Sequence, residues 1–134
     1  MVVLTGSARI RFGVADVSID GSQTGKEEGG IELEANPGDV FILPAGTAHK
    51  TFNTIPETSL KLLTPGDGHA VDLEGLKGVE LEGFTMMGAY PEGSVWDFAV
   101  GGESEGAYQD VWSVPKPQKD PILGNQAGGL CELW

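Results

Sequence analysis

The residue of this sequence best suited to chemistry is His49, within a run of turn and strand residues at 37–53. An imidazole can bind a metal ion or transfer a proton near neutral pH. The Pro-Gly-Asp triplet at 37–39 predicts a turn, and the apolar run at 40–43 predicts a short buried strand. A second turn at 44–46 leads into a strand that begins at His49. Facing the interior of a β-barrel, this imidazole would supply one metal ligand or one polar group of a pocket.

A second group of candidate site residues surrounds the turn at 91–93. Tyr90, Glu92, Trp96 and Asp97 combine aromatic rings with carboxylates, a composition that suits the rim of a small-molecule pocket. The alternative is a plug at the end of a barrel, with its polar groups satisfied by hydrogen bonds. The sequence leaves both interpretations open and favours the plug.

Each residue of the 37–53 run also has a structural interpretation. For His49, two interpretations are equally favoured: a functional imidazole, and a hydrogen-bonded histidine inside a barrel. For Asn53, a hydrogen bond to a backbone turn is favoured over a contact with substrate. Gly38, Pro44 and Gly46 are expected to shape the turns that aim His49.

The remainder of the chain predicts short strands that would position these residues. Residues 8–12 alternate strictly, with Ala8, Ile10 and Phe12 on one face and two arginines on the other. Residues 107–112 fit either a short helix or a strand. About eight or nine strands at this spacing predict an all-β domain, a small antiparallel barrel or sandwich. The other predicted strands lie at 1–4, 14–20, 31–34, 51–63, 79–90 and 94–100, with a loop at 21–30 and an irregular insertion at 64–78.

Composition narrows the class of partner. A chain of 134 residues predicts one domain. Its net charge of −12 and pI near 4.3 argue against nucleic acid and anionic membranes, because both attract basic surfaces. The single cysteine, Cys131, excludes an internal disulfide and fits a reducing compartment as a buried structural thiol. No apolar run approaches a membrane span and no secretory signal pattern opens the chain, so a cytoplasmic protein is expected.

The 37–53 run also resembles the second motif of the cupins. That motif consists of glycine, five residues, Pro-x-Gly, two residues, histidine, three residues and asparagine, and Gly38, Pro44, Gly46, His49 and Asn53 occupy its fixed positions. Further segments, from 3–13 to the terminal Leu-Trp pair, resemble the YjlB-like single-domain cupins, including fungal members linked to secondary metabolism. The resemblance implies a cupin double-stranded β-helix, a jelly-roll-like barrel, as one domain over 1–134. Its core barrel would cover about 1–100, with an extended C-terminal segment at 101–134.

The chain departs from the cupin pattern at the metal site. The first cupin motif supplies a His-x-His pair and a glutamate seven residues before a glycine. If Gly6 is that glycine, all three ligands fall upstream of Met1, and the barrel is expected to be incomplete at its N-terminus. The sequence holds two histidines, His49 and His69, of which the second lies in the glycine-rich insertion. A divalent metal (Fe, Mn, Zn or Ni) is therefore expected only with ligands from an upstream extension.

Three functions follow from these observations. The first, implied by the resemblance, is an oxidoreductase-type accessory enzyme acting on a small metabolite such as a polyketide intermediate. His49 would be catalytic, and Tyr90, Glu92, Trp96 and Asn53 would contact the substrate. The second is a metal-free binding or cyclase/isomerase-like pocket, and the third a truncated fragment without catalysis. A homodimer is expected because an opened barrel exposes sheet edges that need a cover.

Overall fold

The described part of the chain is built mainly from antiparallel strands. The computed structural model describes residues 1–19, 23–26, 28–64, 73–91, 94, 108–120 and 122–133. Within these ranges the elements are β1 (Val2–Thr5), β2 (Ser7–Phe12), β3 (Asp16–Ile19), β4 (Gln23–Lys26), β5 (Ile31–Ala35), β6 (His49–Ile55), α1 (Leu73–Leu76), β7 (Thr85–Met87), α2 (Tyr108–Ser113) and α3 (Leu130–Leu133). The expectation of an all-β chain is met to this extent, with three short helices added.

The sheet that carries His49 has the strand order β5-β2-β6. Both neighbours run antiparallel to β2, which pairs Ile10 with Leu33 on one side and with Thr51 on the other. The predicted alternation in β2 is confirmed, since Ala8 and Ile10 are buried while Arg9 is exposed. Alternate residues of a strand point to opposite faces, so one face of this sheet looks inward and the other outward.

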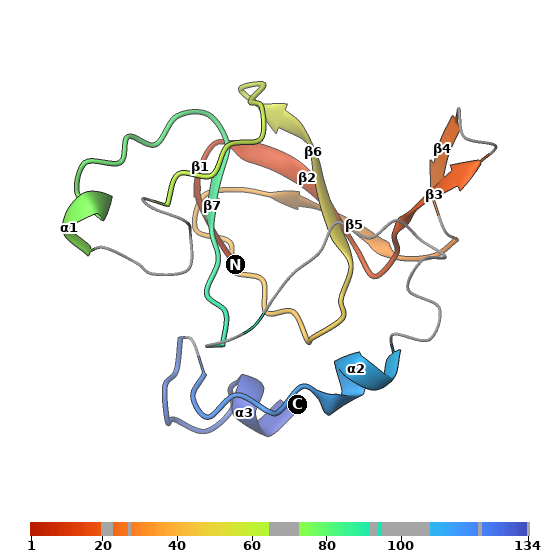
Figure 1. Ribbon diagram of the computed structural model, residues 1–134. Coiled ribbons are helices and arrows are strands. Elements are labelled where there is room, and N and C mark those ends of the chain that lie inside the picture. The colour runs from red at the N-terminus through yellow and green to blue at the C-terminus, as the bar shows by residue number, and fades with distance from the viewer. Residues whose placement is uncertain are drawn as a thin grey trace.

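The core lies on the inner face of this sheet. Val3, Ile10 and Ala35 are fully buried and form its centre. Four larger side chains from β2, the 36–48 segment and the region of β7 pack against them: Phe12, Phe41, Phe84 and Met86. Figure 1 shows the β1–β7 pair on one side of this core and β2, β5 and β6 on the other.

Strand β1 holds the motif segment in place. Backbone hydrogen bonds join Val3 N–H to the Asp39 carbonyl (3.0 Å) and Phe41 N–H to the Met1 carbonyl (2.8 Å). The predicted buried strand at 40–43 is nevertheless wrong. Val40 forms an isolated bridge with Val2, and Ile42 is 44% exposed. Only Phe41 of this run packs on the core, because its neighbours point to the opposite, uncovered side.

Three other regions refine the sequence predictions. The predicted loop at 21–30 is wrong over Gln23–Lys26, which form β4 and pair with β3. Backbone hydrogen bonds can hold a two-stranded ribbon without an apolar face. The polar sequence at 23–26 therefore lacked the apolar alternation that would have predicted a strand. The choice left open at 107–112 is settled by α2, and the described part of the insertion contains α1. Most of the predicted strand at 94–100 lies outside the described residues.

The described strands group into sheets of two, three and two strands. The cupin barrel and the single-domain boundaries therefore stay predictions. The C-terminal helices α2 and α3 lie together beyond one end of the strands (Figure 1). Among the described residues, no helix is long and apolar enough to cross a membrane.

Candidate functional site

The two predicted turns before His49 are present. Gly38 and Gly46 have φ angles of +95° and +76°, in the left-handed region that favours glycine. The first turn is closed by the N–H of Asn36, which donates to the Asp39 carboxylate (2.8 Å), and by the N–H of Asp39, which donates to the Asn36 carbonyl (3.0 Å). The expectation that these glycines shape the approach to His49 is confirmed.

His49 opens β6, as predicted, and lies beside the apolar face of the sheet. It pairs in register with Phe12, so its side chain shares the face that carries Ile10. The imidazole and the Phe12 ring are stacked, with centroids 6.5 Å apart, and the Phe12 ring is 5.2 Å from that of Phe41. His49 itself is exposed. The structure thus presents an accessible imidazole at the edge of an aromatic cluster.

Asn53 lies four residues along the same strand and has a backbone role. Its φ of +51° makes it the one described residue other than glycine with a positive φ. It falls where the β2–β6 register shifts, between the Arg9–Phe52 and Ser7–Ile55 pairs. Asparagine tolerates the left-handed conformation better than most residues, which suits it to this bulge. Its side chain is exposed, and its predicted contact with substrate stays a prediction.

The predicted cluster around the 91–93 turn is described only in part. Tyr90 is exposed and follows β7, and its ring folds over Gly88, where a Cβ atom would meet the Tyr90 hydroxyl at 2.8 Å. Glu92, Trp96 and Asp97 lie outside the described residues, as does His69. Of the candidate residues described, the structure therefore brings His49 and Asn53 onto one strand and places Tyr90 in another segment.

The described residues do not fit the metal site that the resemblance implies. Within them, no group of three or more histidine, cysteine, aspartate and glutamate side chains could hold a metal ion. His49 alone supplies one nitrogen, whereas catalytic metal sites usually use about three protein ligands.

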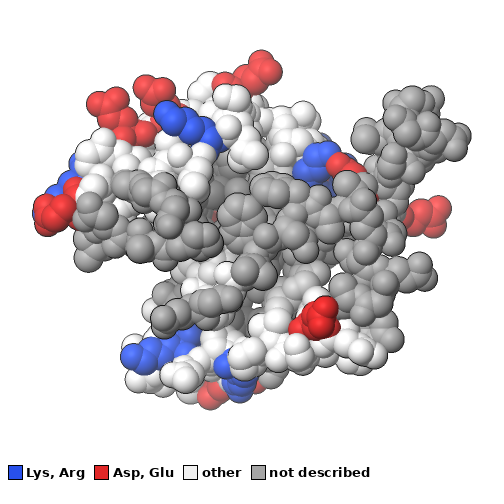
Figure 2. All heavy atoms as spheres, in the orientation of Figure 1, with Lys and Arg blue, Asp and Glu red and all other residues white. Residues whose placement is uncertain are grey.

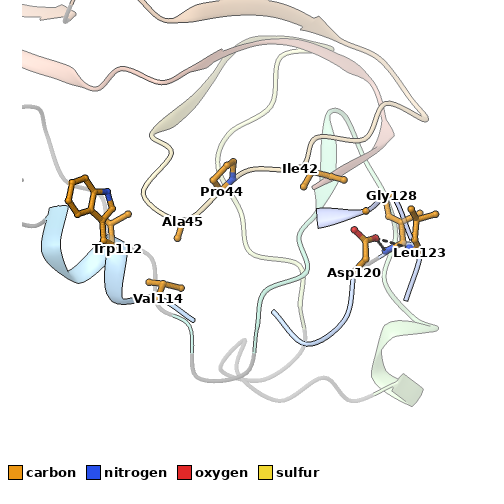
Figure 3. A pocket seen from close by; sticks show the side chains of 11 residues that line it. Ile42, Pro44, Ala45, Trp112, Val114, Asp120, Leu123 and Gly128 are labelled. Carbon is orange, nitrogen blue, oxygen red and sulfur yellow. Dashed lines mark hydrogen bonds between the residues drawn. The ribbon is translucent and has the colours of Figure 1, made fainter. Parts of the chain in front are cut away.

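Sequence reasoning missed a groove beside the motif segment. The groove has a volume of about 870 Å³ and runs between residues 42–45 and the C-terminal segment, here defined as residues 108–133. Figure 3 shows Ile42, Pro44 and Ala45 along one side, Trp112 and Val114 at one end, and Asp120 and Leu123 at the other. The described residues that line it are mostly apolar: Ile42, Pro44, Ala45, Val111, Trp112, Val114, Asp120, Ile122, Leu123, Gly128 and Gly129.

Close contact at Gly46 joins the two sides of this groove. A Cβ atom on Gly46 would lie 2.5 Å from a methyl carbon of Val111 in α2. A side chain at position 46 would therefore push α2 away from the motif segment. The glycine is needed here for both its positive φ and its lack of a side chain.

A buried carboxylate shapes the far end of the groove. Asp120 is 4% exposed, and one oxygen, Oδ1, accepts hydrogen bonds from the N–H groups of Ile122 and Leu123, both at 2.7 Å. Asp120 also exchanges two backbone hydrogen bonds with Gly124. The Cys131 thiol, which was predicted to be buried, is half-buried and donates to the Pro117 carbonyl (3.1 Å).

Comparison with known proteins gives one informative similarity. The chain is 28% identical over 109 residues to the uncharacterized protein YjlB of Bacillus subtilis (strain 168). The chain is similar to YjlB. The match covers 80% of this chain and 50% of YjlB, so the chain spans about half the length of this curated relative. No family model matches the chain, and no solved structure matches it.

This similarity agrees with the YjlB-like resemblance and extends over most of the chain. YjlB is described as uncharacterized, so it supplies neither a substrate nor a reaction.

Proposed function

We propose that this chain is a cupin-type domain that acts on a small metabolite presented to His49. The observation that carries this proposal is the placement of His49 as the first residue of β6, exposed and stacked on Phe12. The turns at Gly38 and Gly46, both at positive φ, support the same motif assignment. An accessible imidazole beside apolar rings offers a bound molecule one polar group and one apolar surface.

For the reaction, we propose oxidation of an alcohol or aldehyde group with dioxygen as the acceptor of the two electrons, a reaction of the oxidoreductase type that the cupin resemblance implies. The resemblance further suggests a polyketide intermediate of secondary metabolism as substrate. His49 would hold a redox-active metal ion such as Fe or Mn together with ligands from outside the described residues, and that ion would supply the activation of dioxygen. Without a metal ion, His49 would bind or orient the substrate.

A second candidate is a metal-free pocket that binds or cyclises an apolar molecule. The groove beside residues 42–45 favours it, because most of its described lining residues are apolar. Such a pocket would work through its shape and a few polar groups, without redox chemistry.

Nuclear magnetic resonance of the histidine side chains tests the proposal directly. The chain has two histidines, so the variant His49→Gln assigns the imidazole signals without ambiguity. Titration with a set of aromatic alcohols and aldehydes should shift the His49 signal saturably with at least one compound. If no compound moves that signal, the proposed role of His49 is wrong.

Metal analysis then separates the two candidates. Stoichiometric binding of a redox-active metal such as Fe or Mn that is lost in His49→Ala would support the oxidoreductase. Saturable binding of an apolar molecule to protein treated with a chelator would support the metal-free pocket.

A further inference from the structure

We infer that the groove between residues 42–45 and the C-terminal segment is a binding site for a small molecule that is neutral, apolar and ring-bearing. This inference goes beyond the role proposed for His49, because His49 is not among the described residues that line the groove. It assigns half of the site to the C-terminal segment, which the sequence did not connect with binding.

The size and openness of the groove fit a small molecule. Its volume of about 870 Å³ falls in the range of ligand pockets, roughly 300–1,000 Å³. Trp112 at one end is 81% exposed, and Leu123 near the other end is also exposed. Ile122, which also lines the groove, is exposed as well. A bound molecule would remove this apolar surface from water, and that burial is favourable in proportion to its area.

The described residues that line the groove offer an anion no cationic side chain. Among the described lining residues, Asp120 carries the sole charge, and its buried Oδ1 already accepts two backbone hydrogen bonds. No lysine or arginine of that set could pair with a carboxylate or phosphate on the ligand. The net charge of −12 also repels anions, although Figure 2 shows basic side chains among the acidic ones on the visible face, including at its lower edge. The ligand class is therefore neutral.

Trp112 and Pro44 indicate a ring system. The indole of Trp112 stands at one end of the groove, and the ring of Pro44 lies along its side (Figure 3). Flat rings gain more than their buried area alone when they stack on an indole. The preferred ligand is thus a neutral molecule with an aromatic or other flat ring.

Two dyes with the same ring skeleton test the charge and the location together. N-phenyl-1-naphthylamine is neutral, and 8-anilinonaphthalene-1-sulfonate adds a sulfonate to the same framework. We expect saturable binding of the neutral dye, seen as a fluorescence increase, and binding of the sulfonate weaker by about tenfold because of unpaired charge.

Matched variants locate the binding. Ile42 and Leu81 are both 44% exposed, but only Ile42 is among the described lining residues. Ile42→Asp should weaken binding of the neutral dye by about tenfold or more, because it places an unpaired carboxylate in the groove. Leu81→Asp should leave the dissociation constant unchanged.

Three outcomes would overturn the inference. They are no saturable binding of the neutral dye, equal effects of the two variants, and tighter binding of the sulfonate. A fourth outcome also contradicts the inference. If a second copy of the chain covers the groove, light scattering will give twice the mass of one chain, and dye binding will fall as the protein concentration rises. If the dye fails while alcohols or aldehydes still shift the His49 signal, the groove inference fails and the proposed function stands. If dye binding depends on Ile42 but no alcohol or aldehyde shifts the His49 signal, the groove inference stands and the proposed role of His49 is wrong.

Discussion

The β5-β2-β6 sheet and the C-terminal segment hold their shapes in different ways. The sheet joins strands far apart in the chain and buries Ile10 and Ala35 completely. The C-terminal segment has two short helices and turns held by local hydrogen bonds at Asp120, and it leaves Trp112 exposed. Burial thus stabilises the sheet, whereas the groove between the two regions keeps apolar surface available for a ligand.

The largest expected effect is on the sheet. Ile10→Ala removes a fully buried side chain and should lower the free energy of unfolding by about 2–5 kcal/mol, through lost burial and a residual cavity. Urea denaturation followed by far-ultraviolet circular dichroism measures it. Leu60→Ala is the control, because Leu60 is 92% exposed and its truncation should change stability by less than about 0.5 kcal/mol. Equal effects of the two variants would mean that Ile10 is not at the centre of the core.

The next effect tests the junction of the two regions. Gly46→Ala should lower stability by about 1–3 kcal/mol, because its Cβ would overlap Val111 at a position that also requires positive φ. It should also weaken binding of the neutral dye, since α2 forms one end of the groove. Urea denaturation and dye titration measure the two consequences.

Gly38 and Val111 supply the controls for this prediction. Gly38 also has a positive φ, but a Cβ there would meet nothing within 4 Å. Gly38→Ala should therefore show the backbone cost alone and leave dye binding unchanged. Adding Val111→Ala to Gly46→Ala should relieve the overlap and restore part of the stability. If Gly38→Ala and Gly46→Ala lose equal stability, steric contact with α2 is not what Gly46 avoids.

The predictions that succeeded rest on local physical rules. Alternation in β2 follows from strand geometry, and the turns at Gly38 and Gly46 follow from the conformational freedom of glycine. The start of β6 at His49 follows from the turn before it. Each of these inferences uses neighbouring residues alone, and tertiary contacts did not override them.

The predictions that failed needed knowledge of distant neighbours. The apolar run at 40–43 predicts a buried strand, but Ile42 lines the groove toward the C-terminal segment and stays 44% exposed. The polar stretch at 23–26 forms β4 because β3 pairs with it. The groove itself joins residues 42–45 to residues 111–129. The one local signal for its far end was the Asp-Pro turn at 120–121, which marks a bend but not a pocket.

The smallest effect concerns the outer face of the sheet, which should be independent of the groove. Asp16 accepts from Arg11 Nη1 (3.2 Å) and pairs with Lys50, while Arg11 Nε donates to Glu32 (3.0 Å). The Arg11 guanidinium also lies 5.3 Å from the centre of the Phe52 ring. Asp16→Asn should lower stability by about 0.5–1 kcal/mol at low salt, because these side chains are only partly exposed.

Salt and a matched ion pair test this interpretation. The effect of Asp16→Asn should shrink in about 1 M salt, since mobile ions screen charges over a few ångströms. Glu74→Gln removes the ion pair with Lys77, in which both side chains are largely exposed, and should change stability less. Dye binding should stay constant in Asp16→Asn, because the outer face and the groove share none of their described residues. A loss of dye binding in Asp16→Asn would show that a change on the outer face of the sheet alters the groove. The sheet and the C-terminal segment would then not be independent of each other.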